Sequence, residues 1–278
     1  MQTVIEVDLA NFFGTIDHQV LLDMLAEKIG DQRFIRYVTR LFKAGVLADG
    51  ELRRSDEGLP QGSMASPVLA NVVAHSVIDT WFEDTVKAHC AGRVELYRYA
   101  DDAVICCQYE RDARRIQRAL GQRLANYHLA LNEEKTRLVA FSRRAQRQGD
   151  KQGAFDFLGF TCYLGRTRRG VTIPKVKTGG KRLQGKLKKV GIWARQVRNV
   201  LPLKPIWNRF RAKLKGHIQY YAMSFNSQAV RRFVYQATRI LFRHLHRRSQ
   251  RKSFTWEQFN RFLANHPLPP VRIQHALY

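Results

Sequence analysis

Residues 94–107 restrict the fold more than any other stretch, because they read VELYRYADDAVICC, two strand-like runs that meet at an acidic pair. The β-branched and aromatic residues on either side of Asp101 and Asp102 predict a half-buried hairpin with both acids at its tip. Adjacent acids within a regular strand would point to opposite faces, whereas at a turn both can face one cleft. Close carboxylates repel each other unless a cation lies between them, and Mg²⁺ prefers such oxygen ligands. The tip therefore predicts either a metal site for phosphoryl transfer or an ordinary exposed acidic turn.

A third acid lies at the end of the first predicted strand. Residues 3–9 alternate as a strand does, with Asp8 near the end, and Asp17 is predicted to cap the helix that follows. Asp8 thereby falls at the C-terminal edge of a strand, where active sites commonly lie. Asp101 and Asp102 follow Asp8 by 93 and 94 positions, yet a sheet could bring all three acids together. Three carboxylates around two Mg²⁺ ions would suit phosphoryl transfer.

The segment 58–67, GLPQGSMASP, has the glycines and prolines of a shaped loop. Ser66 and Pro67 predict the cap and the first position of a helix that runs through residues 68–82. A rigid loop that opens a helix can present backbone groups and the Gln61 amide to a flat ligand such as a base pair. The start of an ordinary helix is the alternative interpretation.

The positive charge lies almost entirely in one segment. The chain has 278 residues and a formal net charge of +25, yet residues 1–156 hold 21 Lys and Arg against 22 Asp and Glu. Residues 157–256 hold 25 Lys and Arg and no Asp or Glu. A folded surface normally mixes both signs, so this segment predicts a polyanionic partner. Aromatic residues lie among these cations, and we expect most of them to pack in helix cores rather than to stack on bases.

Helical spacing predicts helices over residues 181–200, 203–222, 228–246 and 254–263, after a hairpin or flexible connection at 165–180. The four cysteines show no Cys-x-x-Cys spacing, which disfavours a zinc site or a disulfide framework. No apolar run approaches the roughly 20 residues of a membrane span, and the first residues read as a strand rather than a signal peptide. We therefore expect an intracellular protein without a membrane partner.

Five motifs follow one another along the chain: VDLANFFGTID from residue 7, GLPQGSMASPVLAN from 58, YADD from 99, LALNEEKT from 129 and FDFLGF from 155. In this order they resemble the palm of reverse transcriptases. Downstream, LKGHIQYYAMSF and the stretch from Trp256 that ends in HPLPPVRI resemble the maturase (X) domain of bacterial group II intron reverse transcriptases. The resemblance covers nearly the whole chain.

The resemblance implies an α+β fold. It implies a reverse transcriptase palm, an antiparallel sheet with packed helices and partial fingers, at residues 1–164, the linker or hairpin at 165–180, and a basic, mainly α-helical thumb and maturase domain at 181–278. The implied function is an RNA-directed DNA polymerase of a group II intron, in the bacterial cytoplasm, that also binds intron RNA and assists its splicing. The implied cofactor is a pair of Mg²⁺ ions, for which Mn²⁺ can substitute. The implied partners are intron RNA, an RNA template with a DNA primer, and deoxynucleotides.

The resemblance also implies roles for single residues. Asp8 and Asp101 would be the main metal ligands, and Asp102 would complete the catalytic acidic cluster. Phe13 matches the steric gate, where a bulky ring favours deoxynucleotides, although a core phenylalanine beside Phe12 is a rival interpretation. The other residues implied at the nucleotide are Leu9, Phe12, Pro60, Gln61, Gly62 and Lys135. Lys135 would be a proton donor or phosphate contact, with a plain surface lysine as the alternative.

Two further groups of residues are implied to contact nucleic acid. The primer and template would contact Tyr99, Phe157, Leu158 and Gly159. Intron RNA would contact the basic side chains of Lys186, Lys188, Lys189, Arg209, Arg211, Lys213, Lys215, Arg247 and Arg248.

The chain departs from the family pattern at its start. Relatives carry a fingers region that supplies basic residues for the triphosphate, whereas here Met1 lies only seven residues before Asp8. This start predicts a truncated gene or half of a split protein whose fingers come from another chain. Two alternatives to the polymerase stay open: a maturase without chemistry of its own, and a defence-associated or diversity-generating reverse transcriptase. The PQGSMASP loop and the X-like tail favour the intron family.

Overall fold

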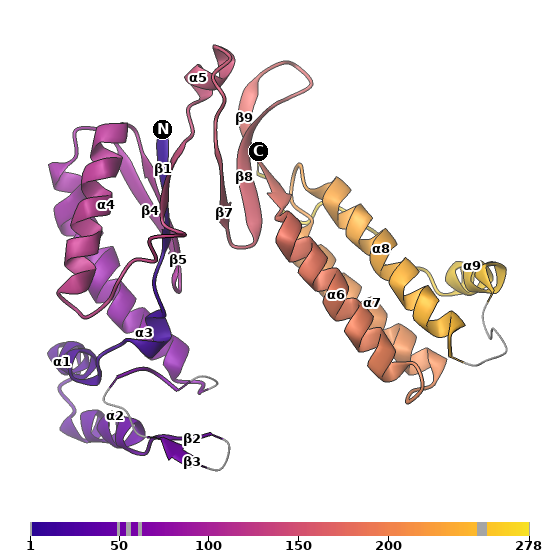
Figure 1. Cartoon of the computed structure of the whole chain (residues 1–278), viewed down its shortest axis with the longest axis horizontal. Coiled ribbons are helices and arrows are strands. Elements are labelled where there is room, and N and C mark those ends of the chain that lie inside the picture. Colours follow the sequence, from indigo (N-terminus) through magenta and orange to yellow (C-terminus); the bar gives the residue numbers. More distant parts are fainter. Residues whose placement is uncertain (1, 49–50, 54–56, 61–62, 249–254, 278) are drawn as a thin grey trace. The chain divides into compact units, whose positions relative to one another are not determined.

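The computed structural model describes residues 2–48, 51–53, 57–60, 63–248 and 255–277, and of residues 46–48 and 51–53 only the backbone. The chain forms two compact units, Met1–Leu158 and Gly159–Tyr278, here called the first and second units (Figure 1). The first unit mixes strands and helices, and the second is mainly helical, which confirms the predicted α+β class. The division into units falls before residue 164, and the assignment of named domains stays a prediction.

A four-stranded antiparallel sheet forms the centre of the first unit. Its strands follow the order β4 (Val94–Tyr99), β5 (Asp102–Cys107), β1 (Thr3–Asp8) and β6 (Arg137–Ala140). The hairpin and the first strand that the sequence predicts are therefore both present. β1 is an inner strand paired on both sides, which explains why its Val4 and Ile5 are fully buried. Helix α4 (Glu110–Ala125) packs against β1 and β5 (Figure 1).

The other helices of the first unit are α1 (His18–Lys28), α2 (Gln32–Lys43), α3 (Ser66–Ala74) and α5 (Arg143–Arg147). Asp17 caps α1 as predicted, since its carboxylate accepts a hydrogen bond from the Val20 N–H at 3.0 Å. This cap satisfies one of the backbone donors that a helix start leaves without a partner.

The prediction that Ser66 caps α3 is wrong. Ala65 occupies the N-cap position, and the Ser66 hydroxyl donates instead to the Pro60 carbonyl at 2.7 Å. Pro67 lies in the first turn, where its missing N–H costs nothing. The chain beyond α3 stays helical as predicted, but through π-helical turns at His75–Asp79 and Phe82–Val86 and a 3₁₀ turn at Lys87–His89.

Three short strands complete the first unit. β2 (Val46–Ala48) and β3 (Glu51–Arg53) pair with each other, and β7 (Ala154–Phe157) lies against β1. Glu6 of β1 holds β7, because its Oε1 accepts from the Asp156 N–H at 3.2 Å while its Oε2 accepts from Arg137 Nε at 2.7 Å. The strand β7 ends at Phe157, because Leu158 and Gly159, which follow it, have positive φ angles of 50° and 81°.

The second unit begins with the antiparallel hairpin of β8 (Phe160–Arg166) and β9 (Thr172–Thr178). Its helices are α6 (Gly180–Val197), α7 (Leu203–Tyr221), α8 (Ser227–His246) and α9 (Trp256–Asn265), which confirms the four predicted helices. The expectation that most of the aromatic residues pack in helix cores holds only in part: Trp207, Phe210, Tyr221 and Phe233 are buried, whereas Tyr220, Phe225 and Tyr235 are exposed. None of the helices in the described ranges is long and apolar enough to cross a membrane.

Candidate active site

The sheet register brings Asp8 to the hairpin tip. Asp8 of β1 pairs with Asp102 of β5, and Asp102 pairs on its other side with Tyr99 of β4. Directly opposed residues of neighbouring strands share a face, so Asp8 and Asp102 lie on the same side of the sheet. Ala100 has a φ of 55°, which turns the chain between the strands and leaves Asp101 exposed in the turn. The two acidic motifs thus meet at one end of the sheet.

Arg98 fixes the turn that carries Asp101. Its guanidinium donates to the Ala100 carbonyl at 2.9 Å and to the Asn71 side chain of α3 at 2.9 Å. It also forms a two-pronged pair with Asp79, with Nε 2.7 Å from Oδ1. Only 10% of the Arg98 side chain is exposed, so these charge-assisted bonds are shielded from water. Sequence reasoning missed Arg98, whose one signal is a cation placed between Tyr97 and Tyr99 in a largely apolar hairpin.

Lys135 forms an ion pair with Asp8, with its Nζ 3.1 Å from Oδ2. The segment that carries Lys135 is bound to the end of β1, because the Asn132 N–H donates to the Asp8 carbonyl at 2.8 Å and the Thr136 hydroxyl to the same oxygen at 3.3 Å. The side chains of Asp8 and Lys135 are 37% and 65% exposed, so the pair is open to exchange with solvent ions. A cation therefore already lies at the Asp8 carboxylate.

Asp102 contacts the segment that the sequence predicts to hold the primer. Its Oδ2 accepts a hydrogen bond from the Leu158 N–H at 3.0 Å. Phe157 and Leu158 are half-buried, and Tyr99 is 69% exposed. Gly159 has a positive φ of 81°, a backbone conformation that favours glycine. A Cβ at this position would also lie only 2.8 Å from the Tyr221 hydroxyl.

The loop that starts at Gly58 lies against the segment after β1. The Leu59 N–H donates to the Phe13 carbonyl at 2.7 Å, and the Gly58 N–H donates to the Ile16 carbonyl at 2.8 Å. Phe13 is half-buried and packs edge-on against the buried Phe12, with ring centres 5.8 Å apart. The structure thus brings Phe13 and the predicted nucleotide loop together.

The remaining residues predicted to contact the nucleotide differ in how far they are buried. Phe12 and Leu9 are 3% and 6% exposed and belong to the hydrophobic core, so their side chains are not open to a ligand. Pro60 is half-buried, and its carbonyl binds Ser66. Gln61 and Gly62 lie outside the described residues.

The carboxylates of Asp8 and Asp101 are chemically suitable ligands for a divalent cation. Carboxylate oxygens are hard ligands of the kind that Mg²⁺ selects, and Asp8 attracts the Lys135 ammonium to the same position. Within the described ranges, however, no three carboxylate, imidazole or thiol side chains lie close enough together to hold one metal ion. Asp8 and Asp101 therefore fit as donors, while the described residues contain no assembled cluster of three acids.

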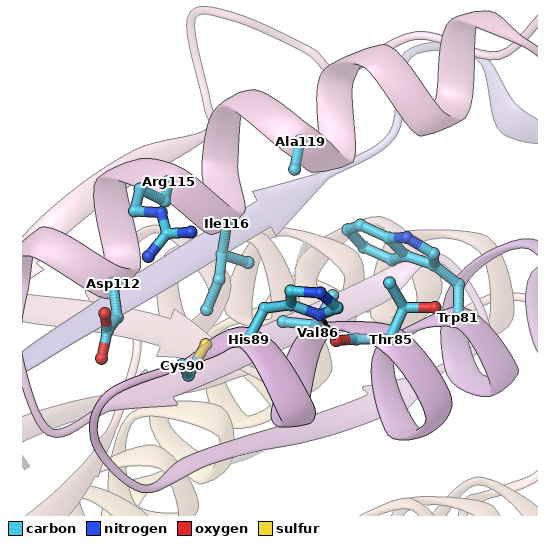
Figure 2. Close-up of a pocket in the computed structure, with 9 residues that line it drawn as sticks. All are labelled: Trp81, Thr85, Val86, His89, Cys90, Asp112, Arg115, Ile116 and Ala119. Atoms are coloured by element: carbon cyan, nitrogen blue, oxygen red, sulfur yellow. Dashed lines mark hydrogen bonds between the residues drawn. The ribbon is translucent and has the colours of Figure 1, made fainter.

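A cavity of about 260 Å³ lies elsewhere in the first unit, between α4 and the helical segment 81–90 (Figure 2). Its wall includes Trp81, His89, Cys90 and Arg115, and none of the predicted site residues. Asp112 lies at one end of it in Figure 2 and is 1% exposed, with Oδ2 accepting from the Gly92 N–H at 3.0 Å. Burial raises the pKa of the Cys90 thiol, so this thiol is a poor nucleophile at neutral pH.

The predicted RNA-binding residues lie on the helices of the second unit and in the turn after α8. Eight are exposed: Lys188, Lys189, Arg209, Arg211, Lys213, Lys215, Arg247 and Arg248. Lys186 is half-buried, and its Nζ lies 4.2 Å above the Tyr221 ring. Burial, together with nearby cations, lowers the pKa of Lys186. Arg248 donates to the Leu201 carbonyl at 2.9 Å.

Known proteins are similar to this chain in sequence. The model of the family described as "Reverse transcriptase (RNA-dependent DNA polymerase)" matches residues 1–162, which is more than half of the chain. The "Putative COX1/OXI3 intron 1 protein" of Saccharomyces cerevisiae is 26% identical over 83% of this chain and 36% of its own length.

Two bacterial proteins match over shorter stretches. Protein YkfC of Escherichia coli is 39% identical over 70 residues, which are 25% of this chain and 18% of that protein. The "Group II intron-encoded protein LtrA" of Lactococcus lactis is 33% identical over 73 residues, which are 26% of this chain and 12% of that protein. The chain thus spans 36% or less of the length of these relatives. It belongs to the reverse transcriptase family and is related to the group II intron-encoded proteins.

Proposed function

We propose that the chain is an RNA-directed DNA polymerase of a group II intron. The observation that carries the proposal is the pairing of Asp8 with Asp102, directly beside the turn that exposes Asp101. Acids from distant motifs that meet at one end of a sheet can hold a divalent ion for phosphoryl transfer. The family match over residues 1–162 supports the same reaction.

In this proposal Asp8 and Asp101 hold Mg²⁺, with Mn²⁺ able to replace it. The bound cations would favour the deprotonated primer 3′-hydroxyl and neutralise charge on the leaving pyrophosphate. Arg98 keeps the Ala100 carbonyl in place, so Asp101 approaches the reacting atoms in one orientation. Lys135 lies 3.1 Å from Asp8, where its ammonium could leave the carboxylate and donate a proton to the pyrophosphate oxygen.

Selection of deoxynucleotides would fall to Phe13. Its carbonyl is held by the Leu59 N–H, and Phe12 packs against its ring, so the side chain cannot easily move away from a ribose 2′-hydroxyl. Gln61 and Gly62, which lie outside the described residues, would contact the incoming base pair. Primer and template would contact Tyr99 and the segment Phe157–Gly159.

The second unit would bind intron RNA and assist its splicing. The eight exposed cations named above and the lack of acids between residues 157 and 256 support this role. A maturase without polymerase activity is the second candidate function, because this unit alone could supply RNA binding. A bacterial cytoplasmic location, where intron RNA and deoxynucleotides are both present, is part of the same proposal.

Replacing Asp101 by Ala tests both roles in one protein. We expect DNA synthesis on a primed RNA template with Mg²⁺ to fall by at least about 100-fold, because the exposed turn loses its cation ligand. Binding of intron RNA to the same variant should stay within about twofold of the original, because the cationic helices are unchanged. The measurements are primer extension and filter binding.

Asp84→Ala serves as the matched control, since Asp84 is an exposed acid of the first unit away from the hairpin tip. This control should keep full synthesis. Unchanged synthesis by the Asp101→Ala variant would leave only the RNA-binding function. Loss of RNA binding together with synthesis would contradict the separation into two roles.

A further inference from the structure

Helix α2 presents a row of arginines to solvent. Val38 and Phe42 are its buried residues, whereas Arg33, Arg36 and Arg40 are exposed. Their spacing of three and four residues puts them on one face, about 4.5 and 6 Å apart along the helix axis. With Tyr37 they line a surface groove of about 360 Å³. We call these four residues the α2 arginine face.

These arginines have no acidic counterpart along their helix. No Asp or Glu occurs between Asp31 and Asp49, and no ion pair involves these three arginines within the part of the chain that the structure describes. Helix α4, by contrast, pairs Arg114 with Glu110 at 2.6 Å. The net charge of residues 1–156 is −1, so the excess of positive charge on α2 cannot be seen in the net charge of this segment. A row of mutually repelling cations suits an anionic ligand.

The aromatic side chain in this row narrows the ligand class. Tyr37 is 69% exposed, and its neighbours Phe34 and Leu41 are each 41% exposed, so none of them serves mainly as a core residue. Guanidinium groups bind phosphates, and an exposed ring stacks on a base only where that base is unpaired. A single strand uses both kinds of group, whereas an acidic peptide or a duplex would use only the charge.

The helix that bears this face is firmly attached. The His18 ring stacks on Phe42 with ring centres 4.2 Å apart, and its Nε2 lies 2.7 Å from the Gly58 carbonyl. The α2 arginine face is therefore connected through one imidazole to the start of the predicted nucleotide loop.

We infer that the α2 arginine face binds a single-stranded nucleic-acid segment, with the guanidinium groups on successive phosphates and a base stacked on Tyr37. The surface adds to the contacts of the second unit. It goes beyond the proposed polymerase function, because strand binding here requires none of the acids at the hairpin tip.

The test uses the full chain and measures binding without deoxynucleotides, so a failure of catalysis cannot imitate a failure of this inference. The ligands are a single-stranded RNA, a blunt RNA–DNA duplex, the same duplex with a single-stranded template extension, and a folded group II intron transcript. The variant is Arg33→Ser/Arg36→Ser/Arg40→Ser. We expect roughly tenfold weaker binding of ligands with unpaired segments and little change for the blunt duplex. The slope of log affinity against log salt should fall by about 2, since each single-strand phosphate contributes about 0.7.

The matched control is Arg111→Ser/Arg115→Ser/Arg118→Ser, which removes the same charge from exposed positions of α4. Tyr37→Leu, which leaves the charge intact, should abolish photo-crosslinking of a 4-thiouridine oligonucleotide to residues 33–40. This second variant keeps the test valid if the triple variant does not fold.

The outcomes separate cleanly. If the α2 triple variant loses binding only to the duplex with the template extension, the face binds a template strand. If it loses binding only to the intron transcript, the face binds unpaired intron RNA. Both results support the inference. Equal effects of the α2 and α4 triple variants would overturn it. It would also be overturned if polyglutamate bound the original chain but not the α2 variant while single-stranded RNA bound both equally, because the face would then serve an acidic protein.

Discussion

At the scale of single residues, the contacts of Asp102 bear on two possible roles, ligand of a cation and positioning residue, which the Tyr-Ala-Asp-Asp motif alone does not distinguish. Its carboxylate accepts the Leu158 N–H at 3.0 Å, which makes it a positioning residue for the segment predicted to hold the primer. A ligand of a cation needs the negative charge, whereas an acceptor of an N–H needs only an oxygen.

Asp102→Asn and Asp102→Ala distinguish these roles. The asparagine keeps an oxygen for the Leu158 N–H, and the alanine does not, so we expect Asp102→Asn to retain roughly tenfold more DNA synthesis than Asp102→Ala. Single-turnover primer extension at several Mg²⁺ concentrations measures the difference. Equal loss in both variants, relieved by raised Mg²⁺, would instead make Asp102 a cation ligand.

At the scale of secondary-structure elements, the β4–β5 hairpin depends on a helix for its shape. Arg98 joins the Ala100 carbonyl to Asn71 and Asp79, which both lie on the long helical segment after the nucleotide loop. The helical segment that follows the nucleotide loop and the acidic turn are therefore coupled through one guanidinium.

Arg98→Lys tests this coupling, because lysine keeps the charge but cannot make the two-pronged contact with Asp79 and the bond to Ala100 together. We expect kcat for DNA synthesis to fall roughly tenfold with little change in KM for the primer–template. Arg93→Lys is the control, since Arg93 precedes the same strand and its side chain is 83% exposed. If the melting temperature of Arg98→Lys fell so far that unfolded protein accounted for the lower kcat, Arg98 would have only a structural role.

Local patterns predicted the elements well, and the contacts between elements less well. The alternation of residues 94–107 and the Asp17 cap were sufficient for the hairpin and for the start of α1, because both depend on neighbours in sequence. The Asp8–Lys135 pair joins residues 127 positions apart, and no local pattern indicates such a contact. Ser66 was misread because its hydroxyl binds Pro60, six residues earlier, instead of the helix end.

At the scale of the whole molecule, we expect the two units to differ in how their stability responds to acid. Glu257 is the only Asp or Glu after Leu158, so carboxylate titration contributes little to the second unit. His217 is buried there between Phe233 and Tyr221, with ring centres 3.6 and 4.7 Å away. Burial, helped by the Lys186 charge, lowers the pKa of His217 to about 4.

This shift predicts the pH dependence of stability. The folded second unit keeps His217 neutral down to about pH 4, whereas the unfolded chain takes up a proton near the ordinary pKa of 6.5. The stability is therefore fully present above pH 6.5 and decreases as the pH falls from 6.5 to about 4. Urea unfolding followed by tryptophan fluorescence in a Trp81→Phe background reports on the second unit, since the other tryptophans lie there.

His217→Phe, which keeps an aromatic ring in the stack, should show a clearly smaller dependence on pH. Some dependence should persist, because burial also lowers the pKa of His244. Identical pH profiles for the original chain and His217→Phe would show that His217 does not cause the acid sensitivity.

The position of β1 in the middle of its sheet has a consequence for biosynthesis. Both of its neighbours, β5 and β6, come much later in the chain, the second beginning at Arg137. A ribosome that adds roughly 5–20 residues per second needs about ten seconds to make the intervening stretch. Until β5 and then β6 have been made, β1 lacks the strands that pair with its two edges, so the nascent protein passes through an aggregation-prone interval that chaperones would have to protect.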